Sequence, residues 1–141
     1  MKLFYLVLSF LSMTQSLHFT YQENFTRSES LRTLVDHKFI SDLKTKNLNN
    51  FKMTEKSKYN KIIEYSGRKY GYPYKAFYDI HHKNDEMFKI RYKNTFLTND
   101  IHLERLKDNI IFVKVDIRTY LPIPQPLLEN IVHRKLEFLR S

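Results

Sequence analysis

The chain has 141 residues, a formal net charge of +9 and no cysteine. Its length allows one domain with a single modest core, and the lack of cysteine excludes a disulfide framework and thiolate chemistry. The positive charge is concentrated in residues 38–93, which carry fourteen Lys and Arg against six acidic residues. Such a charge favours anionic partners: phosphates, acidic lipid surfaces or acidic proteins.

The first sixteen residues have the layout of a secretory signal peptide. Lys2 supplies a positive start, residues 3–11 are apolar apart from Ser9, and Thr14 and Ser16 place small residues before a cleavage site after Ser16. The apolar run is too short to span a bilayer, and no later segment is long and apolar enough for a transmembrane helix. We therefore predict a signal peptide over residues 1–16 and entry into the secretory pathway.

Residues 17–58 are predicted to be a largely disordered spacer that serves as a transit or export segment. They are rich in Ser, Thr, Asn and Lys, with isolated apolar residues and little sustained periodicity. A short helix around residues 31–43 is the exception, because apolar side chains there have near-helical spacing. Asn24-Phe25-Thr26 is a glycosylation sequon, which makes Asn24 a candidate for modification.

A small folded domain is predicted over residues 59–141. Apolar and polar residues alternate along residues 74–81 and again along 87–92, and Lys83-Asn84-Asp85 is a turn signal between them. These segments predict a β-hairpin. The clearest strand covers residues 110–120, and its alternate residues would share one buried face: Ile111, Val113, Val115, Ile117 and Thr119.

A proline-rich junction and an amphipathic helix end the chain. Pro122 and Pro124 stop the strand, because proline cannot donate a hydrogen bond to a ladder, and Pro126 suits the first turn of a helix. From Leu127 onward, apolar residues recur at helical spacing: Leu128, Ile131, Val132, Leu136 and Leu139. The predicted fold class is therefore α+β, an antiparallel sheet closed by a C-terminal amphipathic helix.

The pentapeptide Arg32-Thr33-Leu34-Val35-Asp36 resembles the malaria-parasite export element, in which an arginine, a leucine and an acidic residue alternate soon after a signal peptide. The resemblance implies that a protease cuts after Leu34, with Arg32 and Asp36 in its recognition site, and that the remainder travels into the host cell. The alternative is a bipartite leader that resembles an apicomplexan plastid transit peptide, and plain secretion is the third address. A purely structural interpretation is a helical turn in which Leu34 packs and Arg32 pairs with Asp36.

Cations and aromatic residues are interleaved along residues 68–78. Such a surface could stack on nucleic-acid bases while its cations meet phosphates, or lie at a lipid interface with tyrosines at headgroup depth. The structural alternative is a Gly-Pro turn that leads into a strand whose aromatic residues belong to the core. The candidate residues for an anionic partner are Arg68, Lys69, Tyr70, Tyr72 and Lys75.

No metal site, cofactor or catalytic residue is predicted. The adjacent His81 and His82 would point to opposite faces of a strand, so they could not easily share one ion. Residues 68–139 contain no serine, and the chain has only two glycines, which excludes a Gly-rich phosphate loop. No spacing of carboxylates indicates acid–base chemistry. We therefore expect that the protein is not an enzyme.

The strand, proline break and helix of residues 111–139 resemble the C-terminal part of the START-like helix-grip fold. The residues that carry this likeness are those of the strand face, the junction over residues 122–129 and the apolar stripe of the helix. The resemblance implies a curved antiparallel sheet around a long final helix, with an apolar ligand, often a lipid, between them. The residues expected to contact that ligand are Val113, Val115, Ile117, Leu128, Val132 and Leu136.

The function expected from these features is a small, non-enzymatic binding domain for an apolar ligand or lipid, delivered through the secretory pathway. Two alternatives stay open. One is a basic interaction module for nucleic acid or an organellar ribosome, and the other is an effector exported to a host cell.

Overall fold

The computed structural model describes residues 15–24, 29–46, 50–69, 71–107, 109–120 and 122–140. These residues form strands and short helical segments, in this order along the chain: β1 (Gln15–Asn24), α2 (Leu31–Leu34), the π-helical segment η1 (Val35–Ile40), α3 (Ser41–Lys46), β2 (Phe51–Ser57), β3 (Asn60–Lys69), β4 (Tyr72–Asn84), β5 (Met87–Lys93), β6 (Leu97–Lys107), β7 (Ile110–Thr119), α4 (Gln125–Lys135) and the 3₁₀ segment η2 (Glu137–Leu139).

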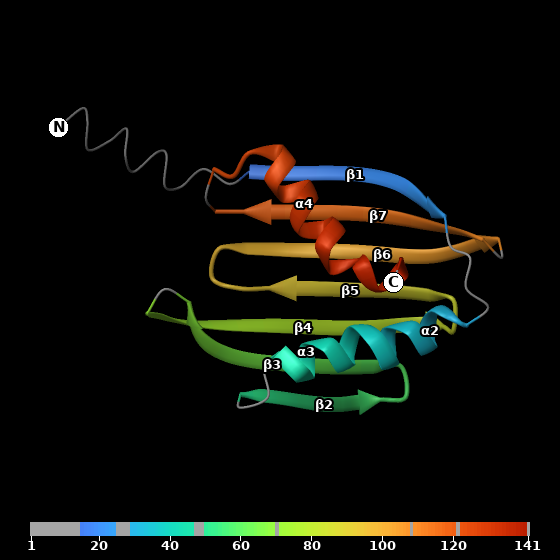
Figure 1. Cartoon of the computed structure of the whole chain (residues 1–141), viewed down its shortest axis with the longest axis horizontal. Coiled ribbons are helices and arrows are strands. Elements are labelled where there is room, and N and C mark those ends of the chain that lie inside the picture. Colours follow the sequence, from blue (N-terminus) through green and yellow to red (C-terminus); the bar gives the residue numbers. More distant parts are fainter. Residues whose placement is uncertain are drawn as a thin grey trace.

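The strands form one antiparallel sheet with the order β1-β7-β6-β5-β4-β3-β2 (Figure 1). Strands β2 to β7 follow one another as a meander, and the predicted hairpin of β4 and β5 is among them. Strand β1 instead pairs with β7 at the far edge, from Gln15 opposite Thr119 to Asn24 opposite Ile110. The segments α2, η1 and α3 connect the two edges, and the α+β class is confirmed.

The two faces of the sheet differ as the period-two pattern predicts. In β7 the five predicted residues, Ile111 to Thr119 at alternate positions, are all buried. In β4 the buried set includes Ala76, Tyr78 and Ile80. We call this buried side of the sheet the inner face and the opposite side the outer face.

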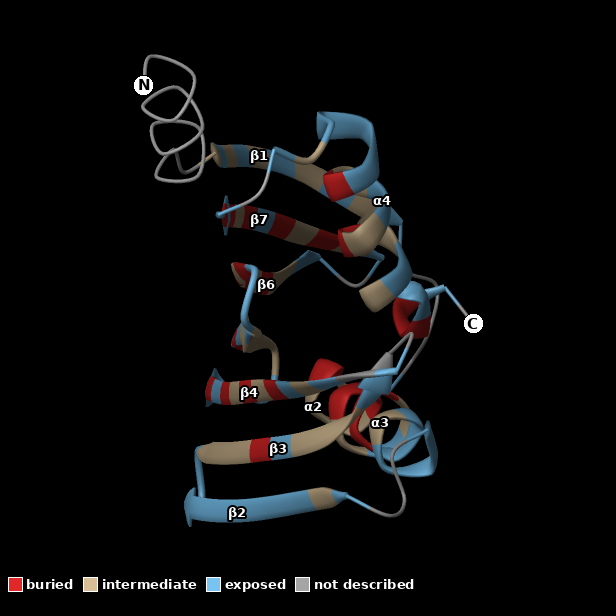
Figure 2. Cartoon of the chain, turned by 90° about the vertical axis from the view of Figure 1, so that its left-hand side faces the viewer, coloured by how far each residue is buried: buried red, intermediate tan, exposed pale blue. Residues whose placement is uncertain are grey.

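All the helical segments lie over the inner face (Figure 2). The first helical stretch begins at Ser30, whose Oγ accepts a hydrogen bond from the backbone N–H of Thr33 at 3.2 Å. The last helix, α4, begins directly after Pro124, close to the position that the prolines predict. The core fills the space between these helices and the sheet, and the side chains of Leu128, Val132 and Leu136 reach it from the C-terminal segment.

The prediction that residues 17–58 form a disordered spacer is wrong for those of them that the structure describes. Those residues supply most of β1, the stretch from α2 to α3, and β2. Strand β1 does alternate, with Leu17, Phe19 and Tyr21 inward, but an edge strand leaves these side chains only half-buried. Strand β2 is exposed along nearly its whole length and therefore carries no apolar pattern. The folded unit includes β1 and does not begin at Tyr59.

The predicted signal peptide falls mostly on residues 1–14, which lie outside the described residues. Its last two residues, Gln15 and Ser16, are the first residues of β1. The side-chain Oε1 of Gln15 accepts a hydrogen bond from the backbone N–H of Ile123 at 3.1 Å. Cleavage after Ser16 would leave Leu17–Asn24 in the strand, so the leader stays a prediction that is compatible with the sheet. Among the described residues, no helix has the length and apolar character needed to cross a bilayer.

The sequon residue Asn24 ends β1, while Phe25 and Thr26 lie outside the described residues. The export-like pentapeptide lies in α2 and η1. Leu34 is fully buried, as the structural interpretation expects.

The expected pair of Arg32 with Asp36 is wrong. Arg32 pairs with Asp85 at 3.2 Å, and Asp36 pairs with Lys61 at 3.1 Å. Both side chains lean toward the sheet instead of along the helix, because η1 packs there. A protease would meet this segment in extended form only before the chain folds, and export stays a prediction.

Candidate functional site

The six residues predicted to contact a ligand all belong to one cluster between the inner face and the C-terminal helix. Each of them is at most 2% exposed. Three come from β7 and three from the segment of α4 and the residue that follows it. The structure thus brings the whole predicted set together in the core, and contact with a ligand remains a prediction for them.

A row of polar side chains crosses the inner face beside this cluster. Tyr78 on β4 lies opposite Tyr92 on β5, and Tyr92 lies opposite Asn99 on β6. The rings of Tyr78 and Tyr92 have centroids 4.8 Å apart, and Tyr65 on β3 stacks on Tyr78 at 6.2 Å. Asn99 in turn lies opposite Ile117 on β7, which joins the polar row to the apolar cluster.

Lys135, the last residue of α4, points its amine at this row. Its Nζ lies 3.3 Å from the centroid of the Tyr92 ring and 5.7 Å from that of Tyr78. The Nζ is buried and has no hydrogen-bond partner. Because burial penalises the charged form, the pKa of Lys135 falls to about 7. A large fraction of this amine is therefore neutral near physiological pH.

Burial shifts the pKa values of the tyrosines in this row in the opposite direction. Burial raises the pKa of Tyr65, Tyr78 and Tyr92 above the usual value of 10.0. Their hydroxyls are thus protonated at neutral pH. The side-chain amide of Asn94, at the end of β5, donates to the Tyr92 hydroxyl at 3.0 Å.

Several polar atoms at this place have no partner within the described chain. They are Nδ2 and Oδ1 of the fully buried Asn99 and the Nζ of Lys135, while the unsatisfied hydroxyl of Tyr21 lies four residues farther along, opposite Val113. The Tyr21 ring lies 5.2 Å from the ring of His133 on α4. Buried polar groups are normally hydrogen-bonded, and each unsatisfied one costs about 1–3 kcal/mol. This arrangement suits a polar group that comes from outside the chain.

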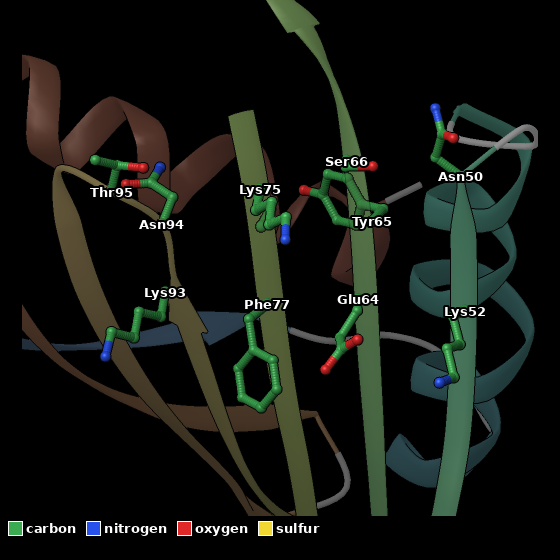
Figure 3. A pocket seen from close by; sticks show the side chains of 11 residues that line it. Asn50, Lys52, Glu64, Tyr65, Ser66, Lys75, Phe77, Lys93, Asn94 and Thr95 are labelled. Atoms are coloured by element: carbon green, nitrogen blue, oxygen red, sulfur yellow. The ribbon is translucent and has the colours of Figure 1, made fainter. Parts of the chain in front are cut away.

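A second candidate site is a cavity of about 450 Å³ lined by residues of β2 to β5 and the turn that follows β5. Cross-strand pairing places Lys52 opposite Glu64, Glu64 opposite Phe77, and Phe77 opposite Lys93. Figure 3 shows these side chains in that order across four neighbouring strands. They belong to the outer face, since they alternate with the inward residues described above.

A cavity of about 500 Å³ overlaps the first, and the two share Asn50, Ser66, Lys75 and Thr95. The second cavity adds Arg68 to the lining. We call the two together the cationic groove. Among the described residues, none of its four cations forms an ion pair, and its lining holds one carboxylate, that of Glu64. The four cations are Lys52, Arg68, Lys75 and Lys93.

Two of the five residues predicted to meet an anionic partner, Arg68 and Lys75, line the cationic groove. Tyr70 and the side chains of Lys69 and Tyr72 lie outside the described residues. The structural alternative for this segment also holds in part, because Tyr78 belongs to the core.

The histidine pair is divided between the two faces, as its adjacency predicts. His82 is buried, with its Nε2 at 2.8 Å from the carbonyl oxygen of Lys58, whereas His81 is exposed. Within the described ranges, no three His, Asp or Glu side chains are grouped so that they could hold a metal ion. The absence of an enzymatic role stays an expectation.

Lys135, Asn99 and the tyrosine row were not among the residues predicted from the sequence. The signals were nevertheless present. Lys135 follows Val132 by three residues and Leu128 by seven, which puts a lysine on the apolar side of the helix. Asn99 alternates with Leu97 and Ile101, so a polar side chain occupies a buried register position of β6.

No protein-family model and no curated protein sequence matches the chain. Ara h 8.0201 is similar in structure, with a TM-score of 0.54 and 9% sequence identity, over 89% of this chain and 94% of that chain. Truncated norcoclaurine synthase from Thalictrum flavum has a TM-score of 0.50 and 13% identity, over 90% of this chain and 91% of that chain. A START superfamily protein from Mycobacterium smegmatis is also similar, with a TM-score of 0.41 and 12% identity over 89% and 91%.

At such low identities, the first two likenesses show a common fold alone. The common fold extends over about nine-tenths of the chain, and the START-like likeness of residues 111–139 stays a resemblance. The apicomplexan origin and the secretory leader stay predictions.

Proposed function

We propose that the chain is a non-enzymatic binding domain for a small amphipathic molecule. The apolar body of the ligand lies between the inner face and α4, and its acidic head lies at the Lys135 amine. The observation that carries the proposal is this buried amine without a partner, in a row that also holds Asn99 with both side-chain amide atoms unsatisfied.

The acidic character of the head follows from the amine. An acid next to Lys135 restores the charged form that burial disfavours, and a charge-assisted hydrogen bond is about twice as strong as a neutral one. The Nδ2 of Asn99 offers a second donor on the same inner face. A carboxylate, sulfonate or phosphate is the class of head group that uses both.

From the Lys135 amine, the apolar body of the ligand extends between the apolar side chains of α4 and those of the sheet. Leu128 and Val132 lie on the same side of the helix as Lys135, and Ile117 lies opposite Asn99 on the sheet. Because these side chains pack against one another, a ligand enters only when α4 shifts away from the sheet.

Two further parts of the proposal rest on the sequence. Delivery through the secretory pathway rests on the first sixteen residues, and the lack of catalysis rests on the absence of cysteine and of a signalled acid–base pair. Norcoclaurine synthase is named as an enzyme, but its likeness to this chain shows the fold alone and does not transfer its activity. The comparisons offer no support for a nucleic-acid partner.

The test has two arms. Solvent extraction and mass spectrometry of the purified full chain are expected to recover an amphipathic acid. Titration with anilinonaphthalene sulfonate, an apolar probe with a permanent acidic head, is expected to give saturable fluorescence. Lys135→Met should weaken probe binding about tenfold or more, since one charged hydrogen bond is lost.

Lys114→Met is the matched control, because Lys114 is an exposed lysine on the outer side of β7. It should leave probe binding unchanged. Equal losses in both variants, or binding that survives intact in Lys135→Met, would contradict the proposal. So would a purified protein that yields no ligand and takes up no probe.

A further inference from the structure

One end of the sheet carries most of the unpaired charge described above. It holds the β3–β4 turn, the β5–β6 turn with Thr95, and the end of β7, and we call it the Thr95 end (Figure 1). The residues of the cationic groove lie on the parts of β2 to β5 that are nearer this end. Thr95 lines both of its cavities. The β2–β3, β4–β5 and β6–β7 turns lie at the opposite end of the sheet.

The cations of the groove are available to an external anion. A third cavity, of about 350 Å³ on the outer side of β1, β7, β6 and β5, provides the contrast. Its lining holds two arginines and two aspartates, so the charges nearly balance: Arg91 Nε donates to Asp100 at 2.8 Å and His18 Nδ1 bonds Asp116, while Arg118 forms no ion pair among the described residues. The groove has four cations, none of which forms an ion pair among the described residues, and one carboxylate. Its electrostatic field therefore attracts anionic groups.

Exposed apolar side chains lie at the same end of the sheet, next in sequence to Thr95 and, for Tyr120, in the lining of the third cavity. Phe96 follows Thr95 and is 52% exposed, and Tyr120 is 49% exposed. The backbone N–H of Tyr120 donates to the carbonyl oxygen of Phe96 at 2.9 Å, which makes the two residues neighbours. The side chain of Asn94 accepts from the backbone N–H of Phe96 at 2.8 Å and fixes the turn. Leu127, in the first turn of α4, is 54% exposed, and α4 begins near the same end (Figure 1).

We propose that the Thr95 end docks on an anionic lipid membrane, with headgroup phosphates in the cationic groove and Phe96 and Tyr120 at the interface. Unpaired cations beside exposed aromatic and aliphatic side chains are the combination that binds such a surface. A soluble phosphate compound would use only the cations and would leave the apolar side chains in water. This inference is independent of the proposed ligand site.

The chain contains no tryptophan, so a single introduced tryptophan reports on its own position. Phe96→Trp places the reporter at the Thr95 end. Leu106→Trp places it at the opposite end, where Leu106 is 49% exposed. Full chains with either substitution are mixed with vesicles of phosphatidylcholine, with or without phosphatidylserine. The emission of the Phe96→Trp variant is expected to shift to the blue only with phosphatidylserine and to return as salt is raised, while that of the Leu106→Trp variant stays unchanged.

Charge reversal then locates the contact. In the Phe96→Trp background, Lys75→Glu with Lys93→Glu should weaken vesicle binding at least about 25-fold, because each basic residue near the surface contributes about fivefold. Lys83→Glu with Lys107→Glu, two exposed lysines toward the opposite end, is the matched control and should weaken binding far less.

Four results would overturn the membrane proposal. The first is an equal blue shift on both kinds of vesicle, and the second is equal losses in the two double variants. The third is an emission of the Phe96→Trp variant that responds to neither kind of vesicle. The fourth is full competition by glycerophosphoserine, the same headgroup without acyl chains, which would assign the groove to a soluble anion.

Discussion

Lys135 is the residue whose environment departs furthest from what its chemistry favours. A buried ammonium without a counter-ion is costly, so the amine gives up its proton, and its pKa falls to about 7. The ring of Tyr92 at 3.3 Å offers a cation–π contact, worth about 2 kcal/mol when desolvated, which only partly offsets the loss of water. The residue therefore couples protonation both to folding and to any acid that reaches it.

The pH dependence of stability follows from this coupling. Between about pH 7 and 10.5, the unfolded chain binds a proton at Lys135 that the folded chain lacks, so Lys135 makes the free energy of unfolding rise with pH from about pH 7 to pH 10. Above 10.0 the trend reverses, because the tyrosines of the row, with raised pKa values, keep protons that the unfolded chain loses. Burial lowers the pKa of His82 from 6.5, so this histidine changes the free energy of unfolding only below about that pH.

Thermal denaturation followed by circular dichroism tests the prediction at the residue scale. The melting temperature of the native chain should rise from neutral pH to about pH 9.5, and that of Lys135→Met should stay nearly flat over the same range. Lys114→Met serves as the control and should follow the native profile. Identical slopes for the native chain and Lys135→Met would rule out the assigned protonation.

At the scale of elements, α4 is held to the sheet by few side chains. Within the helix only Leu128 and Val132 are buried, and Leu136 adds a third contact just after it. Adjacent leucines show the asymmetry of the helix, since Leu128 is fully buried while Leu127 is 54% exposed.

Leucine-to-alanine substitutions at these two positions form a matched pair. Leu128→Ala should lower the free energy of unfolding by about 2–5 kcal/mol, through lost burial and a residual cavity. Leu127→Ala should change it by no more than about 0.5 kcal/mol. Urea denaturation measures both values, and similar losses in the two variants would mean that α4 does not pack on the sheet as described.

The elements that could be predicted from the sequence are those with one clearly buried face. Strand β7 and helix α4 have apolar periods that match their geometry, and the prolines between them mark the boundary. Strands β1 and β2 are the two edges of the sheet, so their inward residues are only half-buried or exposed and their pattern is weak. The pairing of β1 with β7 joins residues nearly a hundred positions apart, and no local pattern encodes such a distance.

The site was predictable in its apolar part and not in its polar part. The six residues assigned to a ligand come from the two best-patterned elements, and they do lie together. The polar row depends on the register of three strands, which fixes Tyr78, Tyr92 and Asn99 side by side. The cationic groove likewise combines β2, β3, β4 and β5, while the sequence showed only the basic stretch that supplies Arg68 and Lys75.

At the scale of the whole molecule, the sheet carries two separate candidate binding surfaces, one on its inner face below α4 and one on its outer face. The inner face and α4 enclose the amine of Lys135, while the outer cationic groove and the exposed side chains of Phe96 and Tyr120 lie at one end. Strand β1 completes the edge beside β7, so removal of the chain up to Leu34 would take away both this strand and α2. A mature form that began at Val35 would therefore leave β7 as an edge strand of the sheet.

Proton uptake on ligand binding tests the central claim most directly, because it links the ligand to the buried amine of Lys135. Anilinonaphthalene sulfonate does not itself titrate near neutral pH, so calorimetry in buffers of different ionisation enthalpy reports protons gained by the protein. At about pH 8 the native chain should take up about one proton per bound probe, as the neutral Lys135 amine becomes charged, and Lys135→Met should take up none. Probe binding by the native chain without proton uptake would place the acidic head elsewhere and contradict the account.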